Sequence, residues 1–222
     1  MRLFRTVFIV AIILAVLGLR LGAEDWSKVY KRTVADHLVI LDIRLEGQPD
    51  VRGMCSGVVV AYGQVLTAAH CLLNTEMPAQ TGYVDGKAVH VLHTADKIDL
   101  VLVEARTKGK RPIVIPFAGP DPGTPIAAIG QASGDTHPSI SPMTVMTTQG
   151  GIVYVNNTLL KGYSGGPLVT LQGHLAGIMV ATNLEWGFAL GIDITTIRAF
   201  LGSPAVDELL FPRMLVRPAR EP

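Results

Sequence analysis

The sequence is poor in charged, aromatic and cysteine residues, and each scarcity excludes a class of protein. Charged residues make up 17% of the 222 residues and aromatic residues 6%. The 19 basic residues nearly balance the 18 acidic ones without forming a basic stripe, so a nucleic-acid partner is not expected. Two cysteines are too few for a disulfide-framework miniprotein or a four-cysteine zinc site. Apolar residues still reach 49%, which excludes a disordered chain. We expect neither a metal nor a cofactor.

No apolar run is long enough to make a confident membrane span. The uncharged stretch 7–19 lies between two arginines and is shorter than the roughly 20 residues that a spanning helix needs. A basic start, a short apolar core and the small residue Ala23 predict that residues 1–23 are a secretory signal. The alternative is an uncleaved membrane anchor formed by residues 7–19. In both cases we expect the folded part to be secreted or periplasmic, where a disulfide persists.

The rest of the chain predicts an all-β fold. Short runs rich in Val, Ile, Leu and Thr are separated by turn residues, which favours antiparallel barrels or sandwiches over a parallel sheet with crossover helices. The predicted strands are 37–45, 56–62, 87–93, 98–104, 124–130, 151–156, 167–171 and 174–182. The predicted helices are 24–33 and 193–201.

A stretch rich in Gly and Pro, 108–125, suits a linker between two halves of the chain. The predicted organisation is therefore a leader at 1–23, an N-terminal unit at 24–107, a C-terminal unit at 108–202 and a tail at 203–222. The sequence predicts no oligomeric state.

The first segment suited to chemistry holds His70 in a tight turn after a strand. Cys71 follows directly, and Cys55 lies sixteen residues upstream. A bridge between them would limit the movement of the imidazole and stabilise the fold by about 3 kcal/mol in the chain-entropy model. The alternative is two buried free cysteines and a structural histidine.

The second segment, 97–103, places Asp99 in an otherwise apolar strand. Burying a carboxylate without a partner is costly, and an imidazole N–H is a natural partner for it. The alternative is an Asp at the exposed end of the strand, hydrogen-bonded by backbone. Asp96, in the preceding polar turn, is the rival candidate.

The third segment, 161–168, places Ser164 between glycines. Glycines permit backbone angles and close approaches that other residues forbid. A serine in such a loop can stand exposed while backbone N–H groups converge on a developing oxyanion. The alternative is an ordinary Gly-rich turn between strands.

The three segments, in this order, resemble those of the chymotrypsin-like (trypsin-fold) serine endopeptidases. They are Thr67-Ala-Ala-His-Cys71, the strand that Asp99 leads, and Gly162-Tyr-Ser-Gly-Gly-Pro167. Residues 173–178 and 186–190 are similar to the HtrA-type branch. The resemblance covers residues 34–202 and implies two six-stranded antiparallel barrels with the active site between them. No PDZ domain is expected in the short segment that follows.

The resemblance also implies residue roles. Ser164 is expected to be the nucleophile, His70 the general base and then acid, and Asp99 the carboxylate that orients the imidazole. The backbone N–H groups of Gly162 and Ser164 are expected to bind the oxyanion. The expected activity is hydrolysis of protein or peptide substrates through an acyl-enzyme intermediate. The alternative is an inactive protease fold that binds peptides or a partner.

Specificity is predicted from the residues expected to form the pocket wall. These residues are Thr158, Val180, Ala181, Thr182, Gly187 and Ala189. None is acidic, so selection of Arg or Lys is not expected. We predict cleavage after a small or medium apolar residue, with the substrate backbone adding as a strand along residues 180–182.

Tyr163 departs from the family pattern. Trypsin-like zymogens carry an Asp at this place, and that Asp pairs with the ammonium of a newly cut N-terminus. A tyrosine cannot form this ion pair, so no zymogen switch of that type is expected. The loop around Ser164 must then be ordered by packing, substrate or a partner.

Overall fold

The computed structural model describes residues 26–74, 76, 78–95 and 97–202. The predicted leader (1–23), the tail (203–222) and the rival carboxylate Asp96 lie outside the described residues. Within the described part of the chain, no helix is long and apolar enough to cross a membrane.

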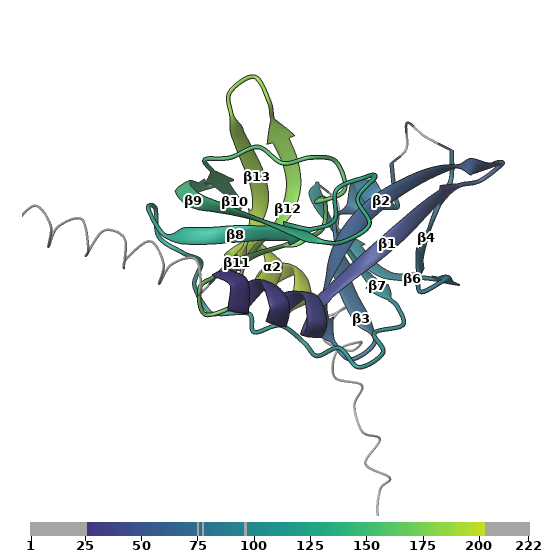
Figure 1. The fold of residues 1–222 in the computed structure, drawn as a ribbon, viewed down its shortest axis with the longest axis horizontal. Helices are drawn as coiled ribbons and strands as arrows, with labels where there is room; N and C mark the ends of the chain where they lie inside the picture. The colour runs from purple at the N-terminus through teal and green to yellow at the C-terminus, as the bar shows by residue number, and fades with distance from the viewer. Residues whose placement is uncertain (1–25, 75, 77, 96, 203–222) are drawn as a thin grey trace, which may run out of the picture.

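Two antiparallel β-units form the body of the structure (Figure 1). The first is a seven-stranded sheet with the order β5-β4-β1-β2-β3-β7-β6. Its strands are β1 (Leu38–Leu45), β2 (Gln48–Ala61), β3 (Gln64–Thr67), β4 (Gln80–Val84), β5 (Lys87–Ala88), β6 (His90–Ala95) and β7 (Ile98–Glu104). A single 3₁₀ turn, η1 (Ala69–Cys71), follows β3.

The second unit is a closed barrel with the order β10-β13-β12-β11-β8-β9. Its strands are β8 (Pro125–Gly130), β9 (Ser139–Gln149), β10 (Ile152–Val155), β11 (Pro167–Thr170), β12 (Leu175–Asn183) and β13 (Phe188–Asp193). The β12–β13 hairpin projects from this barrel at the top of the view (Figure 1).

Strands of the first unit are apolar on both faces because they separate two cores. In β7, Leu100 and Leu102 belong to one hydrophobic cluster, whereas Val101 and Val103 belong to another. Successive side chains of a strand point to opposite faces, so a strand buried on both sides is a continuous apolar run. The first cluster also takes residues from the barrel, including Ile178, and it therefore joins the two units.

Two short helices add to this shared core. The N-terminal helix, residues 26–36, contributes Val29, and α2 (Ile194–Leu201) contributes Ile197 and Phe200. Asp193 caps α2, since its carboxylate accepts a hydrogen bond of 2.7 Å from the Thr196 N–H.

The predicted all-β double barrel with a short C-terminal helix is confirmed, with one correction. Six strands were expected in each unit, but the N-terminal sheet has seven and does not close. The strand predicted at 87–93 is two strands, because Lys87–Ala88 pairs with β4 whereas the residues from His90 onward pair with β7. Gly63 lies in the turn of the β2–β3 hairpin and Gly173 in that of the β11–β12 hairpin, and both have positive φ, 77° and 75°.

Candidate functional site

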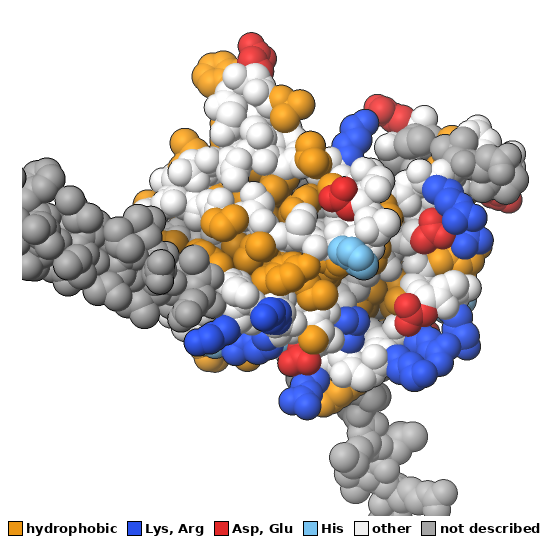
Figure 2. All heavy atoms as spheres, viewed as in Figure 1, with side chains coloured by type: hydrophobic (Ala, Val, Ile, Leu, Met, Phe, Trp, Pro, Cys, Tyr) orange, Lys and Arg blue, Asp and Glu red, His pale blue; other side chains and the backbone are white. Residues whose placement is uncertain are grey.

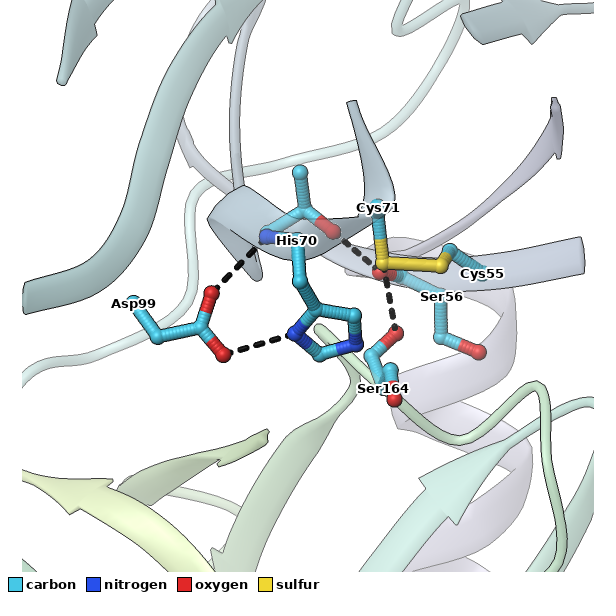
Figure 3. Close-up of polar contacts among 7 residues, drawn as sticks. Cys55, Ser56, His70, Cys71, Asp99 and Ser164 are labelled. Carbon is cyan, nitrogen blue, oxygen red and sulfur yellow. Dashed lines mark hydrogen bonds and ion pairs between the residues drawn. A yellow bond between two sulfur atoms is a disulfide. The ribbon is translucent and has the colours of Figure 1, made fainter. Parts of the chain in front are cut away.

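His70 and Asp99 come from adjacent elements of the N-terminal sheet. His70 lies in η1 after β3, Asp99 lies near the start of β7, and β3 pairs with β7. The Asp99 carboxylate accepts two hydrogen bonds from His70, at 2.6 Å from Nδ1 and at 2.8 Å from the backbone N–H (Figure 3). Both the position and the plane of the imidazole are therefore fixed by one carboxylate.

The electrostatic consequence is a carboxylate that stays ionised. Partial burial favours the neutral form and on its own would raise the pKa of Asp99. The hydrogen bonds from the His70 side chain and backbone, together with the imidazolium charge, outweigh that effect, so the pKa lies below its ordinary value. Since the carboxylate accepts from Nδ1, the unprotonated nitrogen of a neutral His70 is Nε2.

Ser164 comes from the other unit, in the loop between β10 and β11. In Figure 3 it lies beside the imidazole on the side away from Asp99. Its backbone carbonyl accepts a hydrogen bond of 2.8 Å from the Ser56 N–H on β2 and lies 3.9 Å from Cys71 Sγ. No hydrogen bond joins the Ser164 hydroxyl to His70 in the described structure. The three residues nevertheless face one another across the junction of the two units.

The disulfide predicted between Cys55 and Cys71 is present, with the two Cα atoms 6.3 Å apart. It links β2 to the turn that carries His70. Because Cys71 also contacts the Ser164 carbonyl, the bridge lies directly behind the site (Figure 3).

The two expected oxyanion donors lie in a loop with little freedom. In the described structure, neither the Gly162 N–H nor the Ser164 N–H donates to a protein acceptor. Gly162 has φ +104°, and a Cβ there would lie 2.2 Å from the Gln131 carbonyl oxygen. Only glycine fits at this position.

A cavity of about 440 Å³ opens beside Ser164. Most of its wall is apolar, formed by Leu159, Leu160, Met179, Val180, Ala181 and Leu184. Lys161, Tyr163, Ser164 and Thr182 complete it, and no carboxylate is among these residues. The tip of the β12–β13 hairpin carries the exposed side chains of Leu184 and Trp186 beside an acidic one (Figure 2).

The predicted wall residues fall into two groups. Val180, Ala181 and Thr182 line the cavity, whereas Thr158, Gly187 and Ala189 are not among its lining residues. Ala189 is fully buried inside the barrel, and Gly187 lies in the hairpin turn with no atom within 4 Å of a Cβ built there. Leu159, Leu160 and Leu184, which sequence reasoning missed, take their places. Leu159 and Leu160 directly precede the segment 161–168 that carries Ser164. This closeness in sequence was the signal that could have identified them.

Within the described residues, no cluster of three or more His, Cys, Asp or Glu side chains is arranged to hold a metal ion. The site offers a hydroxyl, an oriented imidazole and two backbone N–H groups without a protein acceptor among the described residues, all beside an apolar cavity.

Two antiparallel β-units, with the His70–Asp99 pair on one and Ser164 on the other, are the architecture of the trypsin-fold proteins. A family model described as "Trypsin-like peptidase domain" matches residues 55–178, more than half of the chain. The chain belongs to this family.

Comparisons with known proteins place it near the HtrA-type serine proteases, as the resemblance implied. "Serine protease HTRA1" of Xenopus tropicalis is 28% identical over 163 residues, covering 66% of this chain and 35% of that protein. The Xenopus laevis protein of the same name is 27% identical over the same length. This chain thus spans about a third of the length of the curated relatives that it matches.

Solved structures share the fold at low sequence identity. The active form of the Rv3671c protease from M. tuberculosis superposes with a TM-score of 0.65 at 16% identity, over 76% of this chain and 81% of that one. A serine endoprotease from Yersinia pestis gives a TM-score of 0.65 at 16% identity, over 83% of this chain and 68% of that one. These similarities establish the fold independently of the sequence motifs.

Proposed function

We propose that the protein is a serine endopeptidase that uses Ser164 as nucleophile, His70 as base and acid, and Asp99 as the orienting carboxylate. The observation that carries the proposal is the double hydrogen bond between His70 and Asp99, with Ser164 on the opposite side of the ring (Figure 3). Membership of the trypsin-like peptidase family supports the same assignment.

The proposed chemical steps are those of a Ser-His-Asp triad. The Ser164 oxygen attacks the substrate carbonyl carbon while its proton moves to His70 Nε2. Asp99 stabilises the resulting imidazolium. The tetrahedral intermediate collapses as the C–N bond breaks, and the leaving amine takes the proton from Nε2. Water then hydrolyses the acyl-enzyme by the same route and restores the serine hydroxyl.

The charge that develops on the substrate oxygen needs donors in place before the reaction. The Gly162 and Ser164 N–H groups are suited to this role because no protein acceptor in the described structure uses them. They belong to the same loop as the nucleophile, so a carbonyl that reaches Ser164 lies close to both.

The cavity supports selection of an apolar residue before the scissile bond. Its wall of Leu, Met, Val and Ala side chains favours an apolar group. It also lacks a carboxylate to pair with Arg or Lys, and we propose that the accepted apolar residue is of small or medium size. A peptide library cleaved mainly after Arg or Lys would contradict this specificity.

We also propose that the protein works in an oxidising compartment, secreted or periplasmic. The Cys55–Cys71 bridge behind the site supports this location, because structural disulfides persist mainly outside the cytoplasm. Finding the two cysteines as free thiols in protein isolated from its native source would argue against it.

The activity is tested by labelling with a fluorophosphonate probe, which reacts with an activated serine. We expect the wild type to be labelled and Ser164→Ala not to be. Ser27→Ala is the matched control, because Ser27 is exposed on the N-terminal helix, and it should be labelled like the wild type. Equal labelling of all three proteins, or no labelling of a folded wild type, would instead favour an inactive fold that binds peptides or a partner.

A further inference from the structure

The oxyanion loop, residues 161–164, carries the two oxyanion donors, and each of its four carbonyl groups accepts a hydrogen bond. The carbonyls of Lys161 and Tyr163 accept hydrogen bonds from the Ser133 N–H at 2.8 Å and the Gly166 N–H at 2.9 Å. These two carbonyls share peptide planes with the N–H groups of Gly162 and Ser164. In a trans peptide the C=O and N–H point in opposite directions, so fixing each carbonyl also aims the donor behind it.

Ser56 holds the two remaining carbonyls. This residue is fully buried on β2, in the other unit. Its hydroxyl donates to the Gly162 carbonyl at 2.9 Å and accepts from the Gln131 N–H at 3.2 Å, while its backbone N–H donates to the Ser164 carbonyl at 2.8 Å. Ser56 thus binds Gly162 and Ser164, the two residues whose N–H groups are the expected oxyanion donors. It also links them to Gln131 of the second unit.

Tyr163 fixes the middle of the loop from the barrel side. Its side chain is only 6% exposed, and its hydroxyl bonds to Ser139 Oγ at the start of β9. The ring packs closely against Gly130, where a Cβ would lie 3.0 Å from the ring and 2.9 Å from Ser56 Oγ. The tyrosine is therefore part of the packing that orders the loop. Trypsin-like zymogens use an ion pair between an Asp and the new N-terminus at this place.

From these contacts we infer that Ser56, Tyr163 and Ser139 are positioning residues that preform the oxyanion loop, without a liberated N-terminus or an activating partner. The inference rests on the proposed function, since it concerns the same reaction. It assigns a role to Ser56 and Ser139, which do not line the substrate cavity, and to the hydroxyl group of Tyr163, a residue that also forms part of the cavity wall. Their contribution is to keep the Gly162 and Ser164 N–H groups aimed at the developing oxyanion.

The expected effects follow from what each substitution leaves behind. Ser56→Ala leaves the Gly162 carbonyl without its donor, so the peptide between the two oxyanion donors can rotate. Removing one oxyanion donor costs about 100- to 1000-fold in rate, and a misaimed donor should lose part of that, at least about tenfold. Tyr163→Phe keeps the ring and its packing but breaks the bond to Ser139, and we expect a smaller loss of several-fold.

The experiment measures second-order labelling rates with a fluorophosphonate–rhodamine probe, at a temperature well below the melting temperature of every variant. Turnover of fluorescein-labelled casein gives kcat and KM separately. We expect kcat and the labelling rate to fall for Ser56→Ala with little change in KM, because the substrate cavity is untouched. Ser141→Ala is the matched control and should behave as wild type. The Ser141 hydroxyl accepts a hydrogen bond from Asn157 and makes none with residues 161–164.

A double-variant comparison separates positioning from general weakening. Tyr163→Phe and Ser139→Ala break the same hydrogen bond, so the double variant should lose no more than the larger single loss. A short Gly-Ser extension placed directly before residue 24, where the predicted leader ends, should leave the wild-type labelling rate unchanged.

The outcomes distinguish the two levels of the proposal. A folded wild type that the probe does not label refutes the proposed function, and the inference with it. A labelled wild type whose Ser56→Ala and Tyr163→Phe variants keep its rate refutes only the inference, as does loss of labelling on N-terminal extension. If Ser56→Ala does not fold, the Tyr163→Phe and Ser139→Ala comparison decides the matter.

Discussion

Reduction of the Cys55–Cys71 bridge should weaken both the fold and the site. The bond closes a loop between residues sixteen apart in sequence, and the chain-entropy model gives a stabilisation of about 3 kcal/mol for a loop of that length. For a protein of this size, 1 kcal/mol corresponds to about 2–4 °C in Tm, so reduction should lower Tm by roughly 6–12 °C. The two thiols remain in an apolar environment, since both cysteines are buried.

The same reduction should slow the chemistry at temperatures where the protein is still folded. Cys71 is adjacent to His70 and contacts the Ser164 carbonyl, so loss of the bridge frees the turn that carries the base. We expect the fluorophosphonate labelling rate to fall several-fold on reduction.

The assay is thermal unfolding with and without reductant, with thiols counted by mass spectrometry after alkylation. The double variant Cys55→Ala/Cys71→Ala is the control, and its Tm should not respond to reductant. Complete reduction of the wild type with an unchanged Tm would refute the loop-entropy reasoning. An unchanged labelling rate would refute the argument that the bridge holds the histidine turn.

Three further predictions follow from single residues. Asp99→Asn should lower kcat/KM at least about 10³-fold, because an amide no longer fixes the imidazole as the carboxylate does; near-normal turnover would contradict the assigned role. The pKa of Asp99 is lower in the folded than in the unfolded chain, so its ionisation stabilises the fold above the unfolded pKa, and this stabilisation is lost as pH falls through the folded value. The Tm difference between wild type and Asp99→Asn should therefore shrink from neutral to strongly acidic pH, and a constant difference would count against the pairing. Gly165→Ala should prevent stable folding, because a Cβ there would lie 2.0 Å from Thr67 Oγ1 at a φ of +80°. Gly187→Ala, with φ +69° and open space, should cost only about 1 kcal/mol, and similar Tm values for the two variants would refute the steric argument.

The polar residues of the site were predictable because each lies in a short pattern with strict local demands. An aspartate that enters a buried strand needs a partner, and the structure places His70 Nδ1 2.6 Å from it. β7 was also predicted with both ends correct, Ile98–Glu104. Its two buried faces leave a short apolar run, and a run of this length favours a strand over a helix.

Three strands were missed because their pairing is not visible locally. β9 contains Pro142 and has an exposed second half, so it shows neither a continuous apolar run nor clean alternation. β4 and β13 contain Gly82 and Gly191, where a Cβ would lie 2.7 Å and 2.8 Å from a neighbouring leucine side chain, so the fold leaves room only for glycine. Such contacts depend on residues far away in sequence.

The cavity wall was predicted only in part for a similar reason. β12 and β13 pair with a register shift between Met179 and Ala181. A shift of one residue exchanges the inward and outward faces of a strand, and no motif in this sequence reveals it. The contacts of the oxyanion loop were equally hidden, because Ser56 hydrogen-bonds to the Gly162 carbonyl from 106 residues away.

The hold on the oxyanion loop has a consequence for the response of the protein to salt. All four of its carbonyls accept from neutral amides or a hydroxyl, whereas an ammonium–carboxylate latch would weaken as counterions accumulate around it. The geometry of this loop should therefore persist from dilute buffer to brine.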